Sequence, residues 1–144
     1  MLNLTKEGIV VQFLPEAKDF GVSLNQAIMK IYISGPITGC DLRSRKEFFE
    51  KVAETIRQQG HVPVNPLEGI SDTAEQTEET HKQYMLRDLQ MLLRCDAIVL
   101  LGGWSRSGGC LMEYAAAQRC GLSCYDYKKQ KTVDYPAKIG FIIL

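Results

Sequence analysis

Short runs of apolar residues alternate along the chain with longer segments in which apolar residues recur every three to four positions. The runs predict strands over 31–34, 62–64, 97–101, 122–127 and 138–144. The periodic segments predict helices over 41–59, 80–94 and 110–119. Strands that lack polar alternation and are separated by helices are typical of a parallel sheet covered on both faces.

Right-handed crossovers favour one arrangement of these elements, an α/β fold with a doubly wound, Rossmann-like or flavodoxin-like sheet. We expect four to five parallel strands in the order 2-1-3-4-5, with helices on both faces of the sheet. Residues 1–28 differ from the rest, because only 9–14 resembles a strand and Pro15 ends it. Met29 directly precedes the first strong strand and could be an alternative translation start. The expected organisation is an N-terminal extension over 1–28 and an α/β domain over 29–144.

Length and composition agree with one soluble domain, since 45% of the 144 residues are hydrophobic and 24% are charged. The 17 basic and 17 acidic residues cancel, and no basic stripe runs along the chain. This balance argues against a nucleic acid polymer as the partner, because such binding depends on phosphate charge. A small anionic ligand remains possible, because backbone N–H groups bind anions without net positive charge.

The five cysteines form no C-x-x-C pair, and neither His61 nor His81 has a partner at metal-ligand spacing. We therefore expect no metal, and no cofactor is implied. An odd number of cysteines in apolar segments is typical of reduced thiols in a cytoplasmic protein. No apolar run approaches the roughly 20 residues that span a bilayer. The N-terminus also lacks a signal-peptide pattern, so we predict a cytoplasmic protein without a membrane partner.

Two glycine-rich loops, Gly35–Gly39 and Gly102–Gly109, follow the first and third predicted strands. In a doubly wound sheet, ligands bind beyond the carboxyl ends of the strands where the strand order reverses, which is between these two strands. Each loop leads into a helix N-terminus, whose free N–H groups and dipole favour an anion. Ser107-Gly108-Gly109 adds a hydroxyl and amides suited to one phosphate. For either loop alone, glycines that merely turn the chain explain the pattern equally well.

Two carboxylates are expected to face this cleft. Glu113 falls in the first turn of the third helix, where side chains lean toward the N-terminus and hence back over the loop. Its alternative role is a favourable interaction with the helix dipole. Asp88 falls at the margin of the apolar stripe of the second helix, which includes Leu92 and Leu93. A carboxylate that faces the protein interior is costly unless it is paired or has a function. A helix cap or a salt bridge would also explain Asp88.

Other positions give weaker signals. Asp96, at a junction between helix and strand, is interpreted as a structural turn residue, and His61 as a surface residue. Trp104 could form a wall for a bound base or cover the sheet edge. Residues 66–79 are polar and acidic, which predicts a mobile loop of a length usually reserved for function or disorder.

Three blocks of sequence resemble the nucleoside 2-deoxyribosyltransferase superfamily and, within it, the DUF4406 group. The first is the segment IYISGPITG that starts at Ile31, and the second is Arg87-Asp88 followed by CDAIV from Cys95. The third is Ser107-Gly108-Gly109 leading to Glu113-Tyr114. The resemblance covers about residues 29–127.

This resemblance implies cleavage of the N-glycosidic bond between a base and a (deoxy)ribose. By position, Glu113 matches the nucleophile, which attacks C1′ and forms a glycosyl-enzyme intermediate. Asp88 matches an acidic residue that assists at the base or sugar, and Tyr32 matches a tyrosine that orients the nucleophile. Water as the acceptor gives a hydrolase, and a second base gives a transferase.

Ser107 bears on the substrate, because in the transferases the matching position is an aspartate that handles the sugar 5′-hydroxyl. A serine there is similar to the 2′-deoxynucleoside 5′-monophosphate N-glycosidases, in which it binds the 5′-phosphate. The resemblance therefore favours hydrolysis of a (deoxy)nucleoside 5′-monophosphate, with base exchange or a non-catalytic nucleotide sensor as alternatives. It also implies a homodimer or a higher homo-oligomer. The expected substrate contacts are Ser34, Gly35, Pro36, Ile37, Thr38, Gly39, Ser107, Gly108 and Gly109.

Overall fold

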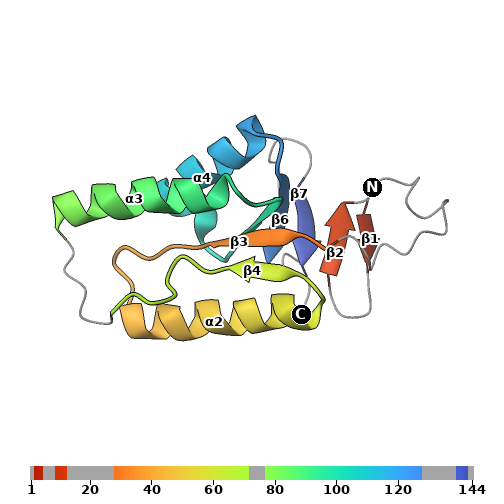
Figure 1. Cartoon of the computed structure of the whole chain (residues 1–144), viewed down its shortest axis with the longest axis horizontal. Helices are drawn as coiled ribbons and strands as arrows, with labels where there is room; N and C mark the ends of the chain where they lie inside the picture. Colours follow the sequence, from red (N-terminus) through yellow and green to blue (C-terminus); the bar gives the residue numbers. More distant parts are fainter. Residues whose placement is uncertain (1, 5–8, 13–27, 72–76, 128–138, 143–144) are drawn as a thin grey trace.

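The computed structural model of the chain describes residues 2–4, 9–12, 28–71, 77–127 and 139–142 (Figure 1). Its strands are β1 (Leu2–Leu4), β2 (Ile9–Gln12), β3 (Lys30–Ser34), β4 (Val62–Val64), β5 (Ala97–Leu100), β6 (Ser123–Tyr127) and β7 (Ile139–Ile142). Its α-helices are α2 (Leu42–Gln58), α3 (Glu78–Leu92) and α4 (Gly108–Arg119), and a 3-10 turn, η2, spans Trp104–Arg106.

The described strands join one sheet in the order β1-β2-β7-β6-β5-β3-β4. The five strands from β4 to β7 in this order are parallel to one another. This confirms the doubly wound α/β fold, and the predicted strands occur in the expected order 2-1-3-4-5. The outer strand β4 contains Pro63, which fits an edge position because proline donates no hydrogen bond.

Two short strands extend the sheet at the opposite edge. β2 pairs antiparallel with β7, and β1 pairs antiparallel with β2. Part of the N-terminal extension therefore continues the sheet beyond β7, and β2 lies within the strand expected over 9–14. The domain boundary after residue 28 stays a prediction.

Helices cover both faces of the parallel sheet, with α2 on one face and α3 and α4 on the other (Figure 1). Successive residues of a strand point to opposite faces. Ile31 and Ile33 of β3 consequently pack in the core on the α2 side, whereas Tyr32 packs in the core on the α3 and α4 side. The carboxyl ends of β3 and β5 emerge between these two helical layers.

The helix α2 begins and ends as its sequence predicts. Asp41 is the N-cap, and its side chain accepts a hydrogen bond of 3.1 Å from the Ser44 N–H. The predicted apolar face is buried at Phe49, and Phe48 is half-buried at its margin. Gly60 adopts a φ of 87°, in the left-handed region that favours glycine after a helix.

The helix α3 differs from the prediction at both ends. It begins at Glu78, because Thr77 and Thr80 form a reciprocal capping box. It ends at Leu92, and Leu93 is the C-cap residue with 47% of its surface exposed. The assignment of Leu93 to the buried stripe was therefore wrong, because Leu93 lies about 100° around the helix axis from the buried Leu92 and faces away from the core.

Three side chains outside the cleft have structural contacts. Asp96 accepts a 2.8 Å hydrogen bond from the Lys30 N–H, which confirms a structural role at the start of the sheet. His61 is half-buried rather than a surface residue, and its Nδ1 accepts from the Met29 N–H at 3.1 Å. Trp104 is buried, and its indole N–H donates to Asp126.

No helix in the described part of the chain is long and apolar enough to cross a membrane.

Candidate active site

A cavity opens at the carboxyl ends of β3 and β5, at the switch point where the sequence places the ligand. It encloses about 830 Å³, including the part open to solvent. Its walls come from the loop after β3, the start of α2, the turn after β4, and the facing sides of α3 and α4. The predicted site residues that line it are Gly35, Ile37, Thr38, Asp88, Ser107, Gly109 and Glu113.

Glu113 is held by two hydrogen bonds from β3. Tyr32 Oη donates to Glu113 Oε2 at 2.7 Å, and Ser34 Oγ donates to Oε1 at 2.6 Å. Tyr32 and Ser34 are two residues apart on one strand, so both side chains point to the α4 face. Both are also almost fully buried. The carboxylate at the cavity wall therefore has each oxygen fixed by a hydroxyl group.

Glu113 lies in the second turn of α4 rather than the first, because the helix already begins at Gly108. The helix dipole acts mainly within the first turn, so it is a poor explanation for this carboxylate. Burial raises the pKa of Glu113 above its ordinary value, the bonds from Ser34 and Tyr32 lower it, and the charge of Asp88 raises it further. The net effect is a carboxyl group with a raised pKa that still accepts two strong donors.

Tyr32 keeps its proton under ordinary conditions. Burial raises the pKa of this phenol, and the negative charges of Glu113 and Asp88 raise it further. Tyr32 therefore acts as a hydrogen-bond donor to Glu113 and not as a base. Cys110 also lines the cavity, and burial raises the pKa of its thiol, so it is not a thiolate nucleophile.

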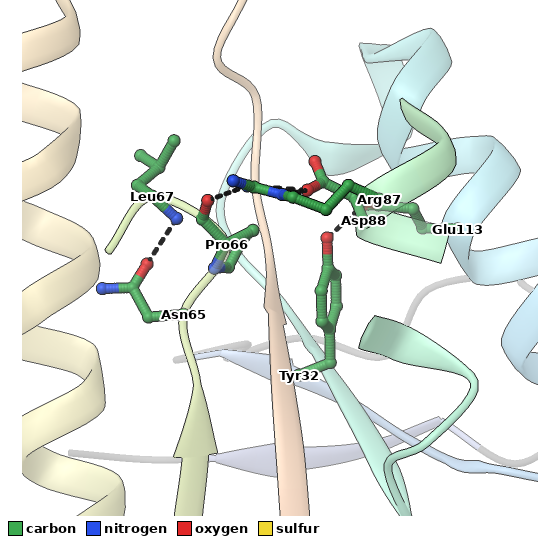
Figure 2. A network of polar contacts seen from close by, with 7 residues as sticks. All are labelled: Tyr32, Asn65, Pro66, Leu67, Arg87, Asp88 and Glu113. Atoms are coloured by element: carbon green, nitrogen blue, oxygen red, sulfur yellow. Dashed lines mark hydrogen bonds and ion pairs between the residues drawn. The ribbon is translucent and has the colours of Figure 1, made fainter. Parts of the chain in front are cut away.

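Asp88 reaches the cavity from α3, and its side chain is 16% exposed. Arg87 Nη2 and Nε donate to Asp88 Oδ1 at 3.0 and 3.2 Å, so the salt bridge left open by the sequence is present (Figure 2). Burial raises the pKa of Asp88, and the bonds and positive charge of Arg87 lower it. Asp88 is thus paired and also faces the cavity, so the two interpretations do not exclude each other.

The predicted substrate-binding residues divide into two groups. Ser34 lies behind Glu113 and contacts that carboxylate, whereas Pro36, Gly39 and Gly108 are not among the cavity-lining residues of the described chain. Gly39 adopts a φ of 81°, so it supports the turn. The other predicted residues of the two loops form the cavity wall.

Ser107 is the N-cap of α4, and its Oγ accepts a hydrogen bond of 3.3 Å from the Cys110 N–H. A hydroxyl that accepts one hydrogen bond can still donate its own proton. Ser107 lines the cavity together with Gly109, so this helix N-terminus presents a hydroxyl and backbone amides to a ligand.

Sequence reasoning missed Arg45, a cation next to the first loop. Its Nε and Nη2 are buried and have no hydrogen-bond partner among the described residues. A Cβ atom on Gly35 would lie only 2.9 Å from Arg45 Nη2, so the guanidinium packs directly against the loop. Its Cζ also lies 5.5 and 5.3 Å from the ring centroids of Phe48 and Phe49. The three basic residues close to the start of α2 were the only signal in the sequence.

Sequence reasoning also missed the part that the turn after β4 plays in the cavity wall. Residues 66–79 were predicted to form a mobile polar loop, and 72–76 lie outside the described residues. In the described part, Leu67 is buried and its N–H donates to Asn65 Oδ1 at 2.9 Å (Figure 2). Pro66, Leu67 and Ile70 line the cavity, and these apolar residues within an acidic segment were the available signal.

Comparison with known proteins shows the family and the fold of this chain. A family model described as "Domain of unknown function (DUF4406)" matches residues 29–126. The chain belongs to the DUF4406 family. No curated protein matches the sequence of this DUF4406 chain.

Two solved structures share the fold of this DUF4406 chain. One is a 2-deoxyribosyltransferase from the psychrotolerant bacterium Bacillus psychrosaccharolyticus, with a TM-score of 0.56 and 16% identity over 73% of this chain and 77% of that chain. The other is a conserved protein from Enterococcus faecalis V583, with a TM-score of 0.51 and 19% identity over 70% of this chain and 64% of that chain. At these identities the likeness concerns the fold.

Two carboxylic groups facing one cavity suit covalent and acid–base chemistry. Both oxygens of Glu113 accept hydrogen bonds from hydroxyl groups, which favours its ionised form, and burial raises the pKa of Asp88, which favours the protonated form that a proton donor needs. Among the described residues, no group of three His, Cys, Asp or Glu side chains could hold a metal ion.

Proposed function

We propose that this DUF4406 chain hydrolyses the N-glycosidic bond of a (deoxy)nucleoside 5′-monophosphate, with Glu113 as the nucleophile. The observation that carries the proposal is the carboxylate of Glu113, held at the cavity wall by Tyr32 and Ser34 and accompanied by Asp88. A carboxylate nucleophile with a nearby carboxylic acid is the arrangement used by retaining glycosidases.

In the first step, a Glu113 oxygen attacks C1′ while the bond from C1′ to the base nitrogen breaks. The electron pair of that bond stays with the base, which takes a proton from Asp88. In the second step, water attacks C1′ and gives a proton to Asp88, and the bond between C1′ and Glu113 breaks. The free sugar phosphate forms and both carboxyl groups return to their starting state.

The hydrogen bonds from Tyr32 and Ser34 serve this chemistry in two ways. They stabilise the ionised form of Glu113, which burial disfavours. They also fix the orientation of the carboxylate, so that little reorganisation is needed when charge moves to C1′.

A 5′-phosphate is supported by the groups on either side of the first loop. Two carboxyl groups in one cavity would repel an anionic substrate unless positive charge balances them. The N-terminus of α4 offers Ser107 and backbone amides, and Arg45 places a buried guanidinium directly against Gly35. We assign the phosphate to the side of the cavity between these two elements.

Base exchange between nucleosides is the second candidate. It is favoured by the fold shared with the 2-deoxyribosyltransferase of Bacillus psychrosaccharolyticus, and it would use the same Glu113 intermediate. The two reactions differ only in the acceptor, because a second base replaces water at C1′.

The test is release of free base from a panel of nucleoside and deoxynucleoside 5′-monophosphates, followed by chromatography. Glu113→Gln should lower the rate on the order of a thousandfold or more, since the nucleophile is lost. Glu47→Gln, on the exposed side of α2, is the matched control and should leave the rate unchanged.

Other results would identify the alternatives. Product that forms only when an acceptor base is added would favour base exchange. A nucleotide that raises the melting temperature of both wild type and Glu113→Gln without any base release would indicate a sensor and refute hydrolysis.

A further inference from the structure

Arg87 connects two walls of the cavity. Its Nη2 donates to the carbonyl oxygen of Pro66 in the turn after β4, and also to Oδ1 of Asp88 on its own helix (Figure 2). Its Nε donates to the same Oδ1. The guanidinium group also lies over the Tyr84 ring, with Cζ 5.5 Å from the ring centroid.

The two carboxylate oxygens of Asp88 differ in their contacts. Both bonds from Arg87 end on Oδ1, and among the described residues Oδ2 has no hydrogen bond. A carboxyl group tied through one oxygen cannot turn freely, so Oδ2 remains available to a ligand in a fixed position. An unpaired Asp88 would instead sample several rotamers at the cavity wall.

The second contact of Arg87 involves another wall of the cavity. Pro66 and Leu67 line the cavity in the turn that follows β4, and Asn65 organises this turn by accepting from the Leu67 N–H. The hydrogen bond from Arg87 joins this turn to α3 (Figure 2). One guanidinium therefore sets both the position of the turn and the orientation of Asp88.

We propose that Arg87 is a positioning residue of this site, which selects the Asp88 oxygen that meets the substrate and holds the Pro66–Leu67 turn in place. The inference rests on the proposed function, because it gives Arg87 a part in the reaction of Glu113 and Asp88. It also predicts a coupling: a ligand that displaces the turn would loosen Asp88 at the same time.

The charge of Arg87 has a consequence for the titration of Asp88. Burial raises the pKa of Asp88, and Arg87 is the group that lowers it, so removal of Arg87 moves the pKa upward. The described part of the turn offers only the uncharged Pro66, Leu67 and Ile70 to the cavity. The other titratable groups at the cavity are His81, Tyr84, Cys110, Glu113 and, behind Glu113, Tyr32.

The decisive measurement is the pH dependence of kcat/KM for base release by Arg87→Met. The limb of the profile that depends on Asp88 should move to higher pH by about half to one unit, since Arg87 is 39% exposed and solvent screens its charge. KM should rise several-fold because the turn is no longer joined to α3. Arg94→Met removes an exposed arginine just beyond the same helix and should leave both unchanged.

Two further variants separate positioning from simple loss of structure. Arg87→Lys restores the charge but not the forked contact, so the pH profile should return toward wild type while KM stays raised. In the Asp88→Asn background, Arg87→Met should cause no further pH shift. A shift that persists in this background, or a rate loss in Arg87→Met without any shift, would overturn the proposal.

The proposal can also be tested if no substrate is cleaved. Carbon-13 NMR titration of the Asp88 carboxyl group in wild type and Arg87→Met needs no turnover, and the midpoint should rise in the variant. An unchanged midpoint refutes the role of Arg87. A raised midpoint in a protein that releases no base supports it and refutes only the proposed hydrolysis.

Discussion

The hydroxyl group of Tyr32 offers the most direct test of how the site works. Tyr32→Phe removes one oxygen atom from a fully buried side chain and leaves the ring packing intact. The lost contact is a 2.7 Å hydrogen bond to a carboxylate oxygen of Glu113. A hydrogen bond to a charged group contributes about 1.5–3 kcal/mol, so the ionised form of Glu113 becomes less stable by this amount.

This free energy has two measurable consequences. Loss of this donor should raise the pKa of Glu113 further, because the ionised carboxylate loses a stabilising hydrogen bond. Since about 1.4 kcal/mol corresponds to a factor of ten in rate, kcat/KM for base release at neutral pH should fall about 10- to 100-fold, and the acid limb of the pH profile should move to higher pH. Tyr125→Phe is the matched control, because its hydroxyl belongs to a buried tyrosine that contacts Met29 and not Glu113.

Stability should follow the same linkage. A carboxyl group with a raised pKa keeps its proton in the folded state at a pH where the unfolded chain has lost it. The free energy of unfolding therefore falls as pH rises from the ordinary pKa of glutamate through the raised value. Tyr32→Phe raises that value further, so its loss of stability should be larger at pH 8 than at pH 5. A variant with a rate loss below twofold and a pH profile that overlays that of wild type would refute this reasoning.

Three other outcomes are expected. Arg45→Met should reduce the ratio of kcat/KM for nucleoside 5′-monophosphates to that for the matching nucleosides at least tenfold. The free energy of unfolding should change little, because the variant removes two buried guanidinium nitrogens that have no hydrogen-bond partner among the described residues and also loses the contacts with Phe48 and Phe49. An unchanged ratio would show that Arg45 does not favour the phosphate. Gly35→Ala should lower the free energy of unfolding by about 1–3 kcal/mol in denaturant titrations, because its Cβ would lie 2.9 Å from Arg45 Nη2 and 3.0 Å from Leu101 Cδ1. Gly39→Ala, where only the positive φ is violated, should cost about 1–2 kcal/mol. A Gly35→Ala variant as stable as wild type would argue against the contact with Arg45. The family resemblance also implies a homodimer or a larger homo-oligomer, which light scattering coupled to size-exclusion chromatography should detect. A monomer at micromolar concentration would contradict that expectation.

Much of the fold could be predicted because it depends on local patterns and one handedness rule. Uninterrupted apolar runs located the parallel strands, and right-handed crossovers ordered them. The positions of Glu113 and Asp88 at the cavity followed from the direction of helical side chains and from the margin of an apolar stripe. These features are properties of single elements and their immediate connections.

The rest depends on contacts between residues far apart in the sequence. Ser34 was assigned to the substrate, although the period of two along a strand places it beside Tyr32 and therefore opposite Glu113. The burial of Arg45 against Gly35 follows from packing between α2 and the loop, which no local pattern encodes. The bond from Arg87 to Pro66 likewise joins two segments 21 residues apart.

The alternation of β3 makes folding and chemistry depend on the same register. The side chains of Ile31 and Ile33 secure the strand in the core under α2, and this choice of face turns Tyr32 and Ser34 toward Glu113. Insertion or deletion of one residue inside the strand would exchange the two faces and remove both donors at once. Correct packing of β3 in the core therefore also places both hydroxyl groups within hydrogen-bonding distance of the Glu113 carboxylate.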